Sequence, residues 1–445
     1  MKINLPENVK FIIRTLEEAG FEAYAVGGCV RDSILGREPN DWDITTSALP
    51  LETKALFKRT FDTGIKHGTV SVLLNKDIYE VTTYRVDGEY EDLRHPKDVT
   101  FTSNLKEDLM RRDFTVNAMA YNDTTGLVDL YGGLSDIENR VIKCVGNPYD
   151  RFNEDALRIL RAIRFAAQLN YDIDEGTKTA IKDLAENLSK ISAERIQIEF
   201  LKMVMSDNPG YIREAYKLGV TKVFMPELDE MMECEQNNIN HAFTVGEHCI
   251  RVMENLPKDK VMRLAGLFHD IGKPRVKTTD DKGNDHFKTH PCVGADMTRD
   301  ILSRLKFDND TKDKVCVYVR NHDGQIITEE DEKSVRRAMN KVGPEFFPNL
   351  FEFAVSDVLA QSEHNREEKL KHIDNLIKIC CKIKENNQAV VLKDLCVSGR
   401  DLIDEGFEPG PNLGKVLCAL LDEVIEDPSK NTREYLLNRA KTMGV

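Results

Sequence analysis

The sequence lacks long apolar runs and paired cysteine motifs, and these absences exclude several classes of protein. No apolar stretch of the 445 residues approaches the ~20 residues that a membrane helix needs. The N-terminal stretch "MKINLPENVKFIIRTLEEAG" alternates charge with hydrophobic residues and has no signal-peptide core. Ten cysteines occur without any CxxC, which favours reduced thiols over disulfides or a zinc knuckle. We therefore expect a cytoplasmic protein with no membrane partner.

An excess of positive charge is also missing. The formal net charge is -14, which argues against a protein that coats nucleic acid non-specifically. A nucleic-acid-binding surface on this chain would have to be a local basic stripe. Hydrophobic residues at 41% and charged residues at 31% are ordinary for a globular protein. The length allows two to four domains at ~100–200 residues each.

The chain divides by pattern into a mixed part and a helical part. In the first part, "TVSVLLNKDIYEVTTYR" predicts a hairpin that turns at residues 75–77, and "LETKALFKRT" has helical spacing. The polar span 85–102 predicts a mobile loop. Beyond about residue 145, apolar residues recur at intervals of three and four, which predicts helices.

Residues 26–50 combine a glycine pair with a D-x-D triplet. Side chains alternate along a strand, so the sequence predicts that Asp41 and Asp43 face the same side and share Mg²⁺ ions. Gly27 and Gly28 remove side chains where backbone N–H groups would approach a triphosphate, and Arg31 can bind phosphate oxygens. A plain turn with loop carboxylates is the alternative, but the close spacing of all these features favours a nucleotide site.

The stretch "GGCVRDSILG…DWDITTSALP" resembles the signature of the nucleotidyltransferase family of bacterial tRNA CCA-adding enzymes and poly(A) polymerases. This resemblance implies an α+β fold, in which a small mixed-sheet, polymerase β-like head precedes helical domains. It also implies two Mg²⁺ ions at Asp41 and Asp43, for activating the RNA 3′-hydroxyl and stabilising pyrophosphate. Glu80 is a candidate for a third carboxylate.

The next motif, "RRDFTVNAMAY" at 111–121, resembles a second signature of the same family. The resemblance assigns Arg112 to the incoming nucleotide, and Asp113 and Asn117 to shaping its pocket. Surface charge before an apolar helix is the plain alternative.

The stretch "EDALRILRAIRF" at 154–165 supplies a local basic stripe. The spacing predicts that Asp155, Arg158, Arg161 and Arg164 follow one helix face. A carboxylate can accept from the exocyclic amine of cytosine or adenine while a guanidinium donates to the adjacent ring nitrogen. An ordinary ion-paired helix is the alternative. The family resemblance makes Asp155 and Arg158 the base readers and adds all four residues to the nucleotide site.

Histidines gather in the second half, where six of the ten lie between residues 241 and 322. A buried His-Asp doublet, as after "LAGLF", needs compensation that metal ligation provides. The set resembles the HD phosphohydrolase superfamily, which implies a transition metal such as Mn, Co, Ni or Fe. The alternatives are histidines with a purely structural role, or a metal-binding helical body that only positions tRNA. The implied first-metal ligands are His248, His269, Asp270 and Asp357, the second-metal ligands are His290 and His322, and His241 and His286 are unassigned.

These observations predict four regions: a head over 1–145, a neck over 146–235, an HD-type domain over 236–365 and a tail over 366–445. The resemblance implies template-independent addition of CCA to tRNA from CTP and ATP. Poly(A) or A-only addition stays open, whereas C-only addition is disfavoured because the loop 85–102 is present. A hydrolase with an RNA-binding head, or a non-catalytic scaffold, is the alternative of another class. The sequence does not choose between monomer and dimer.

Overall fold

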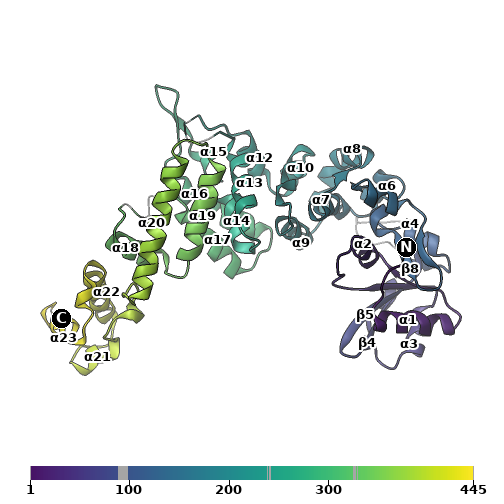
Figure 1. The fold of residues 1–445 in the computed structure, drawn as a ribbon, viewed down its shortest axis with the longest axis horizontal. Coiled ribbons are helices and arrows are strands. Elements are labelled where there is room, and N and C mark those ends of the chain that lie inside the picture. The colour runs from purple at the N-terminus through teal and green to yellow at the C-terminus, as the bar shows by residue number, and fades with distance from the viewer. Residues whose placement is uncertain are drawn as a thin grey trace. The chain divides into compact units, whose positions relative to one another are not determined.

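The computed structural model describes residues 2–88, 99–237, 239, 242–323, 327 and 329–443. The chain folds into two compact units, Met1–Pro226 and Glu227–Val445. Figure 1 shows strands and helices in the first unit and helices throughout most of the second. This arrangement confirms the expected mixed-sheet head with a helical remainder. The four predicted domain ranges remain predictions.

The first unit is built on a seven-stranded sheet of order β3-β4-β5-β2-β1-β8-β9. Its strands β2 and β5 run parallel, and each of the other neighbouring pairs is antiparallel. The sheet is therefore mixed. Its strands are β1 (Ala23–Val26), β2 (Asp43–Thr46), β3 (Thr60–Gly64), β4 (Thr69–Leu74), β5 (Asp77–Thr83), β8 (Met119–Asn122) and β9 (Gly126–Asp129). Two-stranded pairs elsewhere are β6 (Arg85–Asp87) with β7 (Val99–Phe101), β10 (Val141–Ile142) with β11 (Asp172–Ile173), and β12 (Thr278–Thr279) with β13 (Asp285–His286).

The structure confirms the predicted hairpin and changes the predicted loop. Strands β4 and β5 pair up to Leu74 and Asp77, and Asn75 and Lys76 both take positive φ, as a tight hairpin turn requires. The prediction of an irregular loop over 85–102 is wrong at its ends, because β6 and β7 pair there through backbone hydrogen bonds. Residues 89–98 of that span lie outside the described residues.

Helices surround the sheet and continue beyond it in the first unit. Helix α1 buries Val9, Ile12, Ile13 and Leu16, the stripe expected of an amphipathic helix. Helix α7 is mostly buried and packs against α9. The helices of this unit are α1 (Glu7–Glu18), α2 (Gly28–Ile34), α3 (Pro50–Leu56), α4 (Leu105–Met110), α5 (Gly133–Glu138), α6 (Pro148–Glu154), α7 (Leu157–Leu169), α8 (Glu175–Leu184), α9 (Ala193–Val204), α10 (Ile212–Lys217) and α11 (Thr221–Phe224).

The second unit is a stack of helices. Helix α13 packs on α14 and α19, α14 packs on α17, and α19 packs on α20 (Figure 1). No helix in the described part of the chain combines the length and apolarity needed to cross a membrane. The helices are α12 (Pro226–Glu233), α13 (Val245–Asn255), α14 (Lys260–Phe268), α15 (Lys273–Val276), α16 (His290–Arg304), α17 (Asn309–Asn321), α18 (Glu332–Val342), α19 (Phe347–Ala360), α20 (Arg366–Glu385), α21 (Gly399–Asp404), α22 (Pro411–Glu426) and α23 (Arg433–Thr442).

A buried ion pair joins α7 to α9. Arg164 Nε donates to Glu199 Oε2 at 2.8 Å, and the two residues are only 5% and 4% exposed. Burial lowers the pKa of Arg164 to about 10, although Glu199 opposes this shift. Removing one partner of a buried pair leaves an uncompensated charge. Substitution of either residue should therefore destabilise the packing of these helices.

We expect Glu199→Ala to lower the free energy of unfolding of the first unit by about 3–5 kcal/mol, because it strands the Arg164 charge. Urea denaturation followed by circular dichroism measures the loss. The matched control is Glu175→Ala, which removes an exposed pair with Lys178 and should change stability little. Equal losses in the two variants would contradict the assignment of a structural role to the buried pair.

Candidate functional site

Three carboxylates gather where β2 and β5 run side by side. Asp43 is the first residue of β2 and lies directly opposite Glu80 of β5 in the parallel register. Asp41 precedes the strand, so the expectation that both aspartates lie on it is wrong: pairing begins only at Asp43. Desolvation raises the pKa of Asp43, Arg112 opposes this, and Asp41 and Glu80 raise it further. The three carboxylates therefore repel one another, and a cation among them would relieve this repulsion.

The glycine turn brings an arginine close to this edge. Gly27 has a φ of +86°, and a Cβ at this position would lie 3.0 Å from Arg112 Nη1. Glycine suits this position because it tolerates the positive φ and has no Cβ to block the close approach of the guanidinium. Gly28 opens α2 directly after it.

Arg31 is buried and held in place. It forms a two-pronged contact with Asp32, with both hydrogen bonds at 2.9 Å, and its Nη1 donates to Asn117 Oδ1 at 2.6 Å. Its guanidinium carbon lies 5.1 Å from the centre of the Phe165 ring. The structure thus joins the first two predicted motifs through Arg31 and Asn117.

Asp108, which the sequence analysis did not select, anchors both arginines of the second motif. Its fully buried carboxylate lies 2.7 Å from Arg111 Nη2 and 3.5 Å from Arg112 Nη2, and it accepts from Thr45 Oγ1 at 3.1 Å. Burial alone would raise the pKa of Asp108, but the two guanidinium groups bring it below its usual range. The spacing of three and four residues was a visible signal for these ion pairs.

The predicted single helix over 154–165 is interrupted at Asp155. Helix α6 ends at Glu154, α7 begins at Leu157, and Asp155 has an extended backbone between them. Its Oδ1 accepts from the Leu157 N–H at 3.1 Å, and this local bond offers the chain an alternative to the helix. The other oxygen accepts from Arg195 of α9 at 2.8 Å. Arg195 is thus a second residue that the sequence analysis missed.

The guanidinium groups of α7 already have protein partners. Arg158 donates to Glu154 at 2.5 Å and to the Arg111 carbonyl at 3.0 Å. Arg161 donates to Asp113 Oδ2 through two bonds of 2.9 and 2.6 Å. The ring of Phe165 lies 3.5 Å from the Arg164 guanidinium carbon. Arg161 and Arg164 share a network with Asp113 and Glu199, whereas Arg158 pairs with Glu154 and Asp155 with Arg195. The roles of these residues toward a nucleotide stay predictions.

The second unit contains a compact cluster of histidines and aspartates. His248 lies on α13, His269 and Asp270 follow α14, and Asp357 lies on α19. His290 opens α16, and His322 follows α17. The ligand atoms of two sets lie within 4.8 Å of one another: His248, His269 and Asp357 form the first, and Asp270, His290 and His322 the second.

Short distances link the two sets through Asp270. His248 Nε2 lies 2.9 Å from Asp357 Oδ1, and His269 Nε2 lies 3.3 Å from Asp270 Oδ2. The other oxygen, Asp270 Oδ1, lies 3.1 Å from His290 Nε2 and 3.4 Å from His322 Nε2. The structure therefore places all six predicted residues in one cluster.

Backbone carbonyls fix the tautomers of three of these histidines. The Nδ1 atoms of His269, His290 and His322 lie 2.9, 2.7 and 2.8 Å from the carbonyls of Gly266, Phe287 and Val319. A carbonyl only accepts hydrogen bonds, so each Nδ1 carries a proton and each Nε2 is the ring atom turned toward the cluster, where a neutral imidazole would offer its lone pair to a metal. This is the usual arrangement of metal-binding histidines.

Lys273 and Cys249 complete the surroundings of Asp270. Lys273 Nζ lies 2.6 Å from Asp270 Oδ2, and Cys249 Sγ lies within 4.8 Å of a ligand atom of His269 and of Asp270. Burial alone would raise the pKa of Asp270, but Lys273 and His269 hold it well below its usual range. Of the unassigned histidines, His286 is exposed and lies 3.1 Å from Asp280, whereas His241 lies outside the described residues.

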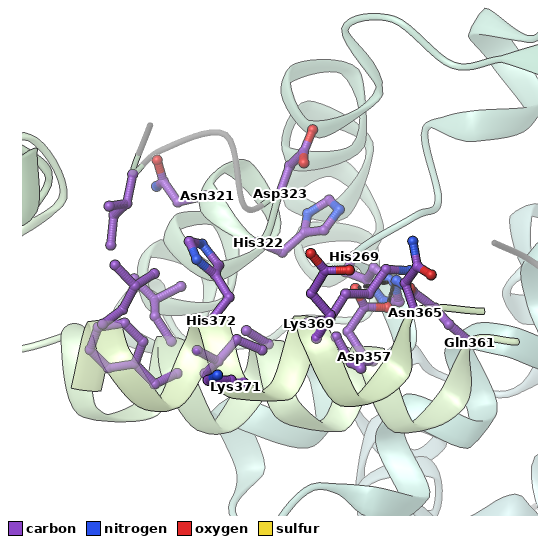
Figure 2. Close-up of a pocket in the computed structure, with 18 of the residues that line it drawn as sticks. His269, Asn321, His322, Asp323, Asp357, Gln361, Asn365, Lys369, Lys371 and His372 are labelled. Carbon is purple, nitrogen blue, oxygen red and sulfur yellow. Dashed lines mark hydrogen bonds and ion pairs between the residues drawn. The ribbon is translucent and has the colours of Figure 1, made fainter. Parts of the chain in front are cut away.

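A cavity of about 950 Å³ opens beside the cluster. Its lining includes His269, Asp270, His322 and Asp357 at one end, and side chains of α19 and α20 elsewhere. Figure 2 shows His269, His322 and Asp357 near Lys369 and Gln361, while His372 lies farther along the cavity. The cluster therefore faces a space large enough for an organic molecule.

Three family models match successive parts of the chain. The poly A polymerase head domain matches residues 23–143, and the probable RNA and SrmB-binding site of polymerase A matches residues 170–232. A model described as tRNA nucleotidyltransferase domain 2, putative, matches residues 290–440.

Similar proteins cover nearly the whole chain. The CCA-adding enzyme of Enterococcus faecalis is 53% identical over 437 residues, which are 97% of this chain and 94% of that protein. The CCA-adding enzyme of Pediococcus pentosaceus is 34% identical over 434 residues, 97% of this chain and 96% of that one. A crystal structure of the Bacillus stearothermophilus CCA-adding enzyme in complex with CTP is 26% identical, with a TM-score of 0.67 and 97% of each chain covered.

The mixed-sheet head and these matches define the class as a nucleotidyltransferase of the poly(A) polymerase type. Within this class, the chain belongs to the family of the CCA-adding enzymes.

We expect Asp108→Asn to lower the free energy of unfolding at neutral pH by about 1–3 kcal/mol, since the buried carboxylate loses its charge beside two guanidinium groups. The pKa of Asp108 is lowered by folding, so its stabilisation is present above the unfolded pKa of about 3.9 and is lost as the pH falls through the folded pKa. Denaturant titrations from pH 8 to 3 should show the two proteins converging in stability at acid pH. A difference that stays constant over this range would contradict the role of the charge.

Proposed function

We propose that this chain adds C, C and A to the 3′ ends of tRNA, with CTP and ATP as substrates. The observation that carries this proposal is the cluster of three carboxylates formed by Asp41, Asp43 and Glu80. This cluster occurs in a chain that is 53% identical to a CCA-adding enzyme over nearly its full length. The tRNA 3′-hydroxyl would attack the α-phosphate of the nucleotide and displace pyrophosphate. Under this proposal, residues 1–145 form the catalytic head, 146–235 the neck, 236–365 the HD-type domain and 366–445 a tRNA-contacting tail.

The donor set at Asp41 and Asp43 fits Mg²⁺. Carboxylate oxygens are the ligands that this hard cation prefers, and the mutual repulsion of the three carboxylates favours a bound cation. Asp41 and Asp43 would hold the metal, with Glu80 as a third candidate. Bound Mg²⁺ supplies Lewis acidity at the α-phosphate and charge compensation for the leaving pyrophosphate.

Arg112 and Arg31 would bind and orient the triphosphate beside Gly27 and Gly28. A Cβ on Gly27 would lie 3.0 Å from Arg112 Nη1, so this guanidinium lies at the glycine turn where the phosphates would bind. Arg31 is held by Asp32 and Asn117, which fixes the position of its guanidinium and reduces the entropy lost on binding.

Asp155 and Arg158 would recognise the base, and Arg161 and Arg164 would hold the wall of the pocket. Cytosine and adenine carry an amine that a carboxylate can accept from, whereas uracil and guanine place a carbonyl there. Arg161 pairs with Asp113 and Arg164 with Glu199, so these arginines hold α7, which carries Arg158 and begins just after Asp155. A-only or poly(A) addition would use the same residues. Incubating tRNA that lacks its CCA end with each labelled NTP singly distinguishes these activities from CCA addition.

We expect Asp43→Ala to lower the rate of nucleotide addition at least about a thousandfold, because the metal contributes several kcal/mol of charge stabilisation in the transition state. The affinity for tRNA should change little, as measured by filter binding. The matched control is Asp77→Ala, an exposed aspartate at the start of β5. Near-normal turnover in the Asp43 variant would contradict the assignment, and Asp41→Ala should behave like Asp43→Ala.

We expect Arg158→Lys and Asp155→Asn to change which NTP is accepted more than the rate with the best NTP. Each recognition contact is worth about 1–3 kcal/mol, so discrimination against UTP and GTP should fall roughly tenfold or more. Competition assays with all four NTPs measure this, with the exposed Asp150→Asn as control. Unchanged discrimination would exclude this pair as the base readers.

As a second activity, we propose that the cluster of the second unit is an HD-type, metal-dependent phosphohydrolase site. The observation that favours it is the clustering of ligand atoms within 4.8 Å of one another, in one set of His248, His269 and Asp357 and a second of Asp270, His290 and His322. Backbone carbonyls turn the Nε2 atoms of three of these histidines toward the cluster. Mixed nitrogen and oxygen ligands suit Mn²⁺, Fe²⁺, Co²⁺ or Ni²⁺. Such a metal supplies Lewis acidity that activates water for attack on a phosphoester. The substrates would be 2′,3′-cyclic phosphates or 2′-phosphates at RNA ends.

We expect the double variant His269→Ala/Asp270→Ala to lose metal-dependent hydrolysis and to retain nucleotide addition, since the proposed nucleotide site is built from residues of the first unit. Hydrolysis is assayed with Mn²⁺, Co²⁺ or Ni²⁺ added, and bound metal by elemental analysis. His286→Ala, an exposed histidine outside the cluster, is the control. Absence of hydrolysis in the unmodified protein with every metal would reject the second activity and leave the first untouched.

A further inference from the structure

The cavity beside the histidine cluster has two chemically different ends. One end is lined by the predicted metal ligands, and the opposite wall is lined by apolar side chains of α19 and α20. Those apolar residues are Phe347, Leu350, Phe351, Ala354, Ile373 and Leu376. Glu330, His372 and Asn375, which are hydrogen-bonded together, also line the cavity. An occupant would thus meet the predicted metal ligands at one end and a largely apolar wall with this polar group elsewhere.

A chain of hydrogen bonds leads from the cluster into this cavity. Asp357 uses Oδ1 toward His248 at 2.9 Å, and its Oδ2 accepts from Gln361 Nε2 at 2.9 Å. The amide oxygen of Gln361 in turn accepts from Lys369 Nζ at 2.8 Å. Gln361 therefore fixes a predicted metal ligand and an ammonium group at the same time.

The position of Lys369 suits an anion at the cluster. Figure 2 shows Lys369 on α20 close to Asp357 and Gln361, all three at the cavity. Lys273 also lies near the predicted ligands, with Nζ 2.6 Å from Asp270 Oδ2. A phosphate at the cluster can accept from Lys369 while the ammonium keeps its bond to Gln361, because a lysine has three donors.

We propose that this cavity is the substrate site of the second proposed activity, on which this inference rests. The cavity binds phosphate esters of flat, apolar organic groups. The phosphate lies at the cluster and accepts from Lys369, and the organic group packs on the apolar wall around Ala354. The volume of about 950 Å³ accommodates an aromatic group of nucleobase size. Gln361 is a positioning residue, since it acts through Asp357 and Lys369.

Phenylphosphonate and methylphosphonate test this site by binding alone, since their C–P bonds resist phosphoester hydrolysis. Titration calorimetry on the full chain with Mn²⁺ measures both affinities, and a metal-free titration shows how far Lys369 contributes without the cation. We expect phenylphosphonate to bind at least tenfold more tightly than methylphosphonate, because the ring covers apolar surface.

Two variants separate the two ends of the cavity. Lys369→Met should weaken both phosphonates about tenfold or more, as expected for a lost charge-assisted hydrogen bond. Ala354→Met fills space at the wall and should weaken phenylphosphonate alone, while preserving the burial of its neighbours. Lys378→Gln, on the same helix and paired with exposed Asp374, is the matched control.

The outcomes distinguish this inference from the proposed hydrolase. Equal binding of both phosphonates, or full binding by Lys369→Met, overturns the inference even where p-nitrophenyl phosphate is hydrolysed. Selective phenylphosphonate binding that depends on Lys369 and Ala354, without hydrolysis by any metal-loaded protein, supports the binding site and rejects the hydrolase. A further arm compares a free nucleoside monophosphate with an RNA oligonucleotide bearing the same terminal phosphate, and thereby identifies the source of the ester.

Discussion

Buried carboxylates fix the arginines of the first unit, and its candidate nucleotide site depends on this pairing. Asp108 holds Arg111 and Arg112, Asp113 holds Arg161, and Glu199 holds Arg164. A carboxylate removed from water is costly unless it is paired, so each of these contacts also ties together the elements that carry its partners. The stability of the head and the orientation of its guanidinium groups therefore share one physical cause.

The second unit meets the same cost with histidines. Asp270 is buried among Lys273, His269, His290 and His322, and Asp357 lies against His248. Backbone carbonyls accept from the Nδ1 atoms of His269, His290 and His322, so their Nε2 atoms face a common centre, as in metal-binding imidazoles. The cluster thus differs in kind from the carboxylate edge of the head, where hard oxygen ligands dominate.

Local patterns predicted the features that depend on near neighbours in the sequence. The hairpin turn at Asn75 and Lys76 was expected from such a pattern. The mixed-sheet fold class and the meeting of six histidines and aspartates were expected from the family resemblance. Partners distant in sequence were not: Arg195 reaches Asp155 across 40 residues, and Glu199 reaches Arg164 across 35. The helix break at Asp155 was missed because residue spacing cannot show a side chain bonding to its own local backbone.

The contacts around Asp155 and Arg158 bear on how a base would be chosen. Asp155 accepts from Arg195 and Arg158 donates to Glu154, so a base bound by these two residues must replace or share these bonds. A cytosine or adenine amine gives Asp155 a new donor in exchange, whereas a uracil or guanine carbonyl gives none and leaves the carboxylate with Arg195. The wrong base would gain no hydrogen bond to Asp155, so nothing would offset the free energy needed to break the bond between Asp155 and Arg195. Discrimination would arise from competition with the protein's own ion pairs as much as from the new hydrogen bonds.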